Sequence, residues 1–155
     1  MIYHRLQRFE PGAVTRVEHS YVPSVGAFFI HLGAKPAGTS DRRHPADDPE
    51  LARYCIDDAT WRSMTRLGGG RDLVGLPLEY VLRTAHSWDG PIGAFVLTVD
   101  SAAGRVATEA GEGRSLVSPC GSGVREIGPG TFAVRHRDLR PDDDLRALFI
   151  DPPIR

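Results

Sequence analysis

The chain has no excess of either charge and no long apolar run. Its net charge is −1, and lysine occurs only at Lys35, with arginines scattered along the sequence. Nothing in this charge pattern forms a concentrated basic region, so we predict no nucleic-acid partner. The longest apolar run, Val25 to Ile30, is far shorter than the ~20 residues that a membrane-spanning helix requires, so we predict no membrane span. The opening residues lack the basic, apolar and small-residue order of a secretory leader, so no signal peptide is expected in this chain.

Motifs for nucleophiles, nucleotide cofactors and metals are missing as well. No serine has Gly-x-Ser-x-Gly neighbours, no Gly-Lys-Ser or Gly-Lys-Thr can cradle phosphate, and the glycines never fit Gly-x-Gly-x-x-Gly. No two of the 6 histidines lie closer than 12 positions, so no single element carries a metal-ligand pair. The acidic run Asp142 to Asp144 lacks the spacing and glycine of a calcium loop, which indicates a solvated turn. We therefore predict no cofactor and no metal site.

Short stretches of alternating apolar and polar residues make up much of the chain, separated by many of its 17 glycines and 12 prolines. The turn-rich connector Trp88 to Gly93 is expected to join two of these stretches as neighbouring antiparallel strands. A further apolar run, rich in aromatics, covers residues 27–32. The predicted strands cover residues 13–21, 76–85, 95–100, 115–118, 124–127, 131–136 and 146–150.

One helical insertion is predicted at residues 49–67. Asp48, Pro49 and Glu50 provide an N-cap, a first-turn proline and a first-turn acid. An apolar face follows, and the glycines from Gly68 onward stop the pattern, although one helix or two short ones fit it equally. Many short strands with a single helical insertion indicate a mainly β fold, an antiparallel β-sandwich or partly open barrel. At 155 residues the chain, residues 1–155, is expected to form a single domain.

Two adjacent carboxyls are the first candidates for a site. Asp57 and Asp58 could act as an acid and base pair, because carboxyls that share a site separate their pKa values. Helix capping is the simpler role for one of them. His86 follows a predicted strand, so it is the better placed histidine for acid and base chemistry.

Aromatic side chains and one further histidine are candidates for ligand contacts. Trp88 lies in a turn, where a large indole needs a neighbouring loop or a ligand to cover it. Tyr54 could line an apolar cleft, although amphipathic aromatics are more often part of a core. His19 lies on the apolar face of a predicted strand, where a partly buried imidazole is more common than a ligand.

Taken together in order, several stretches resemble a bacterial family catalogued as domain of unknown function 4424, over what looks like its C-terminal half. The resemblance implies an exported, periplasmic or secreted protein with no established activity, and this chain lacks the leader and the additional β-rich half of such proteins, so a cytoplasmic location stays open. The stretches that carry it are Phe9 to Gly12, Val17 to Gly26, Tyr54 to Asp58, Tyr80 to Thr84, Trp88 with Gly90 to Gly93, Leu116 to Cys120, Asp138 to Leu145, and Leu148 with Phe149.

The two cysteines lie in two of these stretches, one at a helix start and one at a strand end. The resemblance favours a Cys55–Cys120 disulfide that ties unlike elements together, which requires an oxidising compartment. Two buried thiols in a cytosolic protein are the alternative.

The function that follows is a non-catalytic binding or structural module of the cell envelope. The alternative is a small enzyme with a pocket between helix and sheet, in which Asp57 or Asp58 acts with His86 beside Trp88. A module completed by a partner chain is the third reading. A small-molecule ligand, a protein partner and a homo-oligomer all remain open.

Overall fold

A computed structural model describes residues 10–12, 14–18, 26–32, 48–101 and 115–152. Within these residues, two 3-10 helices, η2 and η3, and one α-helix accompany seven strands. In chain order the elements are β1 (Phe28–Ile30), η2 (Leu51–Tyr54), α1 (Asp58–Gly68), β2 (Leu73–Tyr80), η3 (Arg83–Ser87), β3 (Ile92–Asp100), β4 (Leu116–Cys120), β5 (Arg125–Gly128), β6 (Thr131–Leu139) and β7 (Leu145–Asp151).

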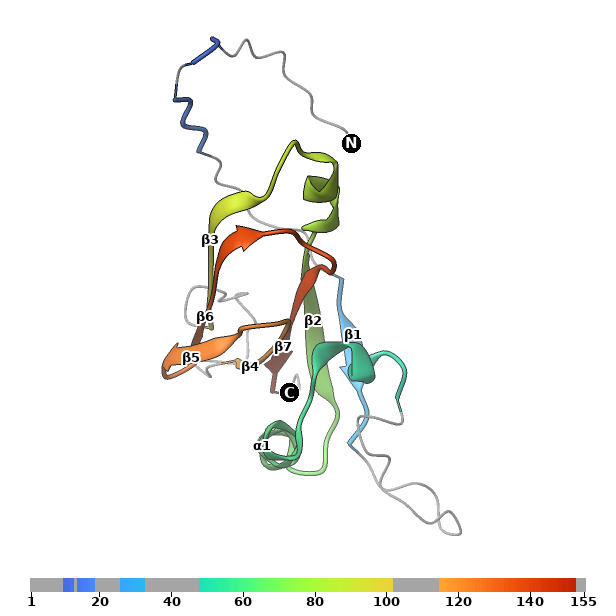
Figure 1. Cartoon of the computed structure of the whole chain (residues 1–155). Helices are drawn as coiled ribbons and strands as arrows, with labels where there is room; N and C mark the ends of the chain where they lie inside the picture. The colour runs from blue at the N-terminus through green and yellow to red at the C-terminus, as the bar shows by residue number, and fades with distance from the viewer. Residues whose placement is uncertain (1–9, 13, 19–25, 33–47, 102–114, 153–155) are drawn as a thin grey trace.

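The strands form two antiparallel sheets, which confirms the mainly β prediction and gives an open, sandwich-like arrangement (Figure 1). The larger sheet has the order β1-β2-β7-β4, and the smaller one has the order β3-β6-β5. All neighbouring strands of the described sheets pair antiparallel, and β7 lies between β2 and β4 in the larger sheet. The larger sheet therefore has β7 near its centre and β1 and β4 at its edges.

Alternate residues of β7 face two different cores. Leu148 and Ile150, both fully buried, pack in one core with Met64 of α1 and with residues of η2. Leu145, on the opposite face of the strand, packs in a second core with Val134 of β6. Together η2 and α1 form a helical layer that covers one side of the larger sheet, and the smaller sheet covers the other side. The described structure therefore has three layers.

The predicted helical insertion consists of two separate pieces. The Asp48 carboxylate accepts hydrogen bonds from the backbone N–H of Glu50 at 2.9 Å and of Leu51 at 3.4 Å, as expected for the start. The first piece is the 3-10 helix η2, and it stops at Cys55, whose φ of 51° is left-handed. A residue in that conformation cannot continue a right-handed helix, so α1 begins anew after Asp57.

The strand predicted over residues 13–21 is not formed in its described part. Residues 14–18 are irregular and exposed, and Val14 is 100% exposed. Two exposed side chains of this segment, Arg16 and Glu18, form an ion pair with each other. Alternation alone did not predict this segment correctly, because a strand also needs a neighbouring strand and an apolar surface to cover. His19 lies outside the described residues.

The strand predicted over residues 76–85 begins earlier, ends at Tyr80 and is followed by η3. The Asp144 carboxylate accepts hydrogen bonds from the backbone N–H of Leu82 at 2.8 Å and of Arg83 at 3.0 Å, which turns the chain out of the strand. The expected pairing with the next strand is also wrong, because β2 and β3 belong to different sheets. Tyr80 still contacts Phe95 of β3 across the two sheets, with ring centroids 6.2 Å apart.

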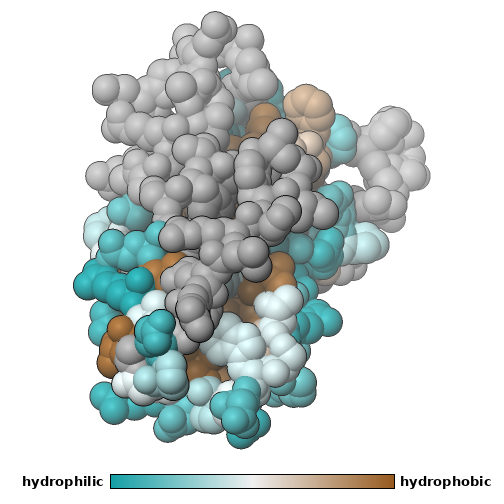
Figure 2. All heavy atoms as spheres, turned by 90° about the horizontal axis from the view of Figure 1, so that it is seen from above, coloured by the Kyte–Doolittle hydropathy of each residue, from teal (hydrophilic) through white to brown (hydrophobic). Residues whose placement is uncertain are grey.

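The other predicted strands are confirmed with shifted ends. They correspond to β3, β4, β5, β6 and β7, and the aromatic-rich run at residues 27–32 contains β1. Seen from above, the described surface is mostly hydrophilic, with a few separate apolar side chains among polar ones (Figure 2). Within the described residues, no helix is long and apolar enough to cross a membrane.

Candidate functional site around the disulfide

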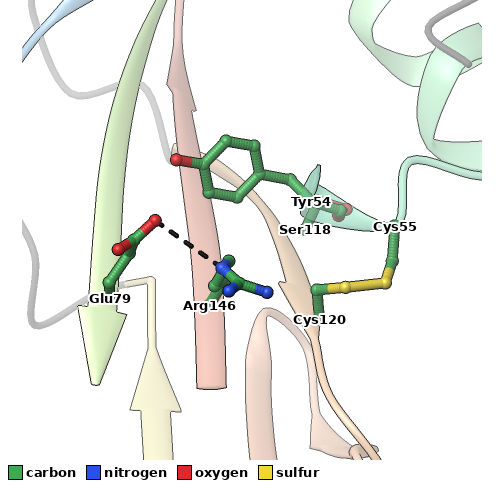
Figure 3. The surroundings of a disulfide bond; sticks show 6 residues. All are labelled: Tyr54, Cys55, Glu79, Ser118, Cys120 and Arg146. Atoms are coloured by element: carbon green, nitrogen blue, oxygen red, sulfur yellow. Dashed lines mark hydrogen bonds and ion pairs between the residues drawn. A yellow bond between two sulfur atoms is a disulfide. The ribbon is translucent and has the colours of Figure 1, made fainter. Parts of the chain in front are cut away.

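The structure pairs Cys55 with Cys120 in a disulfide, across a sequence separation of 65 residues (Figure 3). Cys55 follows η2, and Cys120 is the last residue of β4. The Cα–Cα distance is 5.2 Å, within the usual range for a disulfide. The bond therefore ties the helical layer to an edge strand of the larger sheet, as the resemblance implied.

A buried hydrogen bond supports the disulfide from the neighbouring residues. Ser118 and Cys120 lie two positions apart on β4, so both side chains face the helical layer. The Ser118 hydroxyl donates to the backbone carbonyl of Tyr54 at 2.9 Å. Both residues are buried, so this bond satisfies the end of η2 in a place that water does not reach.

A cluster of three charged side chains lies beside the disulfide. In strand register, Arg146 of β7 is opposite Glu79 of β2 on one side and opposite Cys120 of β4 on the other. The Glu79 carboxylate accepts a hydrogen bond from Arg53 of η2 at 2.6 Å and pairs with Arg146 Nε at 3.6 Å (Figure 3). Arg146 Nε is buried and has no hydrogen bond in the described part of the chain. The Glu79 carboxylate thus connects the helical layer to the larger sheet, in addition to the disulfide. Because it is partly exposed, its ion pairs contribute only modestly to stability.

Tyr54 forms part of the core next to this cluster. It is buried, and Figure 3 shows its ring beside Glu79 and Arg146. Burial raises the pKa of the Tyr54 phenol above its ordinary value of 10.0, so the side chain is neutral at physiological pH. The geometry places Tyr54 inside the structure rather than on the wall of an open cleft.

Asp57 caps α1. Its carboxylate accepts a hydrogen bond from the backbone N–H of Thr60 at 2.7 Å. That bond holds the pKa of Asp57 below its ordinary value of 3.8, because it stabilises the ionised form. Asp58 is the first residue of α1 and an acid in its first turn. The structure therefore gives Asp57 the capping geometry that the sequence offered as the simpler role.

The residues of the acid and base alternative are not brought together. His86 and Trp88 lie in and directly after η3, which follows β2, whereas Asp57 and Asp58 lie at the start of α1, which precedes it. Figure 1 shows α1 at the bottom of the molecule and η3 at the top. His86 is exposed, and the Trp88 side chain is 63% exposed. No common pocket joins these four residues in the described structure.

A hollow of about 280 Å³ does lie between the helix and the sheets, but its lining is different from the predicted one. Three serines provide polar groups in its lining: Ser63 of α1, Ser101 directly after β3 and Ser115 directly before β4. Ser115 donates a hydrogen bond to the buried Asp151 carboxylate. None of the acid or base candidates lines this hollow. Among the described residues, no group of three or more His, Cys, Asp or Glu side chains could hold a metal ion.

Several residues that shape this region were not predicted from the sequence. In the sequence, Glu79 and Arg146 look like ordinary solvent-facing residues of alternating strands. Ser118 is a small polar residue with no local signal of a structural role. Their roles come from strand register, which sequence alone does not give here. Asp144 was predicted only as part of a solvated turn, whereas it caps η3 from a position 62 residues away from Leu82.

The Asp144 cap gives a pH-dependent prediction. Hydrogen bonds from the backbone N–H of Arg83 and Leu82 hold the pKa of Asp144 below its ordinary value of 3.8. The folded state then binds fewer protons than the unfolded state near that pH, so the stabilisation is complete above about pH 4 and is lost as the pH falls further. We expect Asp144→Asn, which keeps an acceptor oxygen but cannot titrate, to show a shallower fall of the thermal midpoint below pH 4. Asp142→Asn, in the same turn, is the control that should follow the wild-type curve. Identical acid profiles for Asp144→Asn and the wild type would contradict the role of Asp144.

These features define a class of protein: a mainly β domain of two antiparallel sheets, with a short helical layer fastened to one sheet by a disulfide. The chain belongs to the family described as a domain of unknown function, DUF4424, whose model matches residues 1–148. No curated protein and no solved structure matches the chain.

Proposed function

We propose that the chain is a non-catalytic binding or structural module of the cell envelope, folded as a single β-rich domain. The observation that carries this proposal is the Cys55–Cys120 disulfide, which connects two layers of the fold. Such bonds persist in oxidising compartments such as the periplasm and are rare in the reducing cytosol. An extracytoplasmic location is therefore the setting in which this architecture is stable.

The described side chains that could take part in catalysis have structural roles, which supports a scaffold rather than an enzyme. Asp57 caps α1, and Asp144 caps η3. Tyr54 is buried in the core, and Glu79 is paired with arginines from two different elements.

Cell fractionation with thiol trapping tests the proposal. The gene in its own host, with all of its native sequence, would carry a C-terminal tag, and acid-quenched cells would be treated with a maleimide that adds mass to free thiols. We expect the tagged protein in the extracytoplasmic fraction, with Cys55 and Cys120 unmodified until a reductant is added. A tagged Cys55→Ser, Cys120→Ser variant sets the background of the labelling.

Recovery from the cytoplasm with both cysteines alkylated would contradict the envelope proposal. A hydrolytic or transfer activity that survives in the purified protein and disappears in a double variant of Asp57 and His86 would instead support the enzyme alternative.

A further inference from the structure

The outward face of the smaller sheet carries arginines on two neighbouring strands. Val134 of β6 is buried in the core between the sheets, so the alternate residues Arg135 and Arg137 point outward. Arg125 of β5 is in register with Ala133 of β6, which places Arg125 on the same outward face. All three arginines are exposed. Together, Arg125, Arg135 and Arg137 form the basic face of the smaller sheet.

Strand geometry sets the spacing of these side chains. Arg135 and Arg137 are two residues apart on one strand, about 6.7 Å, and neighbouring strands are about 4.8 Å apart. Val96 of β3 is directly opposite Arg135, and Ala94 is opposite Arg137. Val96 is 61% exposed, so an apolar side chain lies open beside the arginines.

The charges of the basic face are not neutralised within the described structure. None of its three arginines makes an ion pair with a described acid. Two exposed acids are sequence neighbours of the basic face, Glu126 next to Arg125 and Asp138 next to Arg137. By strand alternation Asp100 also lies on this face, opposite Thr131. Thr131 is four residues from Arg135 along β6, about 13 Å. Three arginines without an ion-pair partner among the described acids thus lie together on the smaller sheet, although the net charge of the chain is −1.

We propose that the basic face binds an acidic polypeptide segment in extended conformation, with carboxylates at alternate positions. In such a segment, side chains on one side repeat every 6.7 Å or so, which matches the spacing of Arg135 and Arg137. Guanidinium groups bind carboxylates through two parallel hydrogen bonds, so successive carboxylates on that side of the segment can each meet one arginine. This inference rests on the proposed binding function and names the chemistry of the partner.

Other anionic partners fit these observations less well. Attachment to an anionic lipid surface is typical of clusters of about 4 to 8 basic residues, more than this face contains. Nucleic-acid-binding domains generally carry a strong overall basic excess, whereas this chain has a net charge of −1. Arginine is enriched at protein interfaces relative to the rest of the protein surface.

The test uses fluorescein-labelled peptides of alternating glutamate and valine, with alternating glutamine and valine as the neutral match. We expect fluorescence polarisation at low salt to show binding of the acidic peptide, with affinity that falls as salt is added. The variant Arg125→Gln, Arg135→Gln, Arg137→Gln should bind at least about ten-fold more weakly, because it loses charge-assisted hydrogen bonds.

A matched variant separates local from overall charge. Arg62→Gln, Arg66→Gln, Arg71→Gln removes the same number of exposed arginines from α1 and the residues after it, and should bind like the wild type. Val96→Glu adds a negative charge opposite Arg135 without removing an arginine, and should also weaken binding about ten-fold or more. Thermal melting shows whether each variant is folded. If the triple variant of the basic face is unfolded, the binding of Val96→Glu tests the proposal instead.

The inference is overturned by equal binding of both peptides, by no binding, or by equal losses in the two triple variants. Vesicles of phosphatidylglycerol in phosphatidylcholine provide a second arm, and binding to them without binding to the acidic peptide would overturn it in favour of a lipid surface. A failure here leaves the envelope location untouched, because the fractionation experiment decides that question separately.

Discussion

Replacing both cysteines, Cys55→Ser with Cys120→Ser, is expected to lower the free energy of unfolding by about 4 kcal/mol. The disulfide closes a loop with a sequence separation of 65 residues. In the chain-entropy model, a bridge across a loop of that length lowers the conformational entropy of the unfolded state, which raises its free energy by about 4 kcal/mol. Because small domains are commonly stable by about 5 to 15 kcal/mol, this is a large share of the total. Urea unfolding monitored by far-UV circular dichroism measures the difference.

The reduced wild type is the matched comparison for the serine variant. Reduction breaks the same bond without changing any other atom of the sequence, so both proteins should unfold at similar urea concentrations. We also expect faster hydrogen exchange at the amides of η2 in both, since only non-covalent contacts, the apolar core and the hydrogen bonds of Ser118 and Glu79, then hold that layer on the sheet. Unchanged urea midpoints in both proteins would show that the bond does not contribute to the free energy of unfolding.

The second large effect is expected from truncating the centre of the larger sheet. Ile150 of β7 is fully buried and packs in the core with Met64 of α1 and Leu73 of β2. Ile150→Ala removes buried methylene and methyl groups and leaves a cavity, so it should cost about 3 kcal/mol, within the range of 2 to 5 for such substitutions. Thermal and urea unfolding at neutral pH both report this loss.

The same substitution at an exposed isoleucine is the control. Ile127 of β5 is 57% exposed, so Ile127→Ala should change the stability by less than about 0.5 kcal/mol. Equal effects at the two positions would show that the core does not lie between β7 and the helical layer.

Local signals in the sequence were sufficient for some parts of the structure. Short apolar stretches bounded by turn residues identified β6 over residues 131–136 and β7 over residues 146–150, since β6 has one face in a core and β7 has both. The cap at Asp48 and the glycines after Leu67 bounded the helical region correctly. Each of these signals depends on contacts within a few residues, and such contacts can be inferred without knowing the fold.

Long-range contacts decided the parts that could not be predicted. The break between η2 and α1 coincides with the left-handed conformation of Cys55, a residue that is bonded to Cys120 across a separation of 65 residues. The end of β2 depends on Asp144, which reaches Leu82 from the turn before β7. The basic face depends on the register of three strands, so scattered arginines in the sequence gave no sign of it.

Non-reducing peptide mapping of the natively folded protein, alkylated before digestion, tests the central claim most directly. We expect a cross-linked species that contains the peptides of Cys55 and Cys120 and separates into the two on reduction. Recovery of both peptides already alkylated, with no cross-linked species, would contradict the fastening of the helical layer to β4.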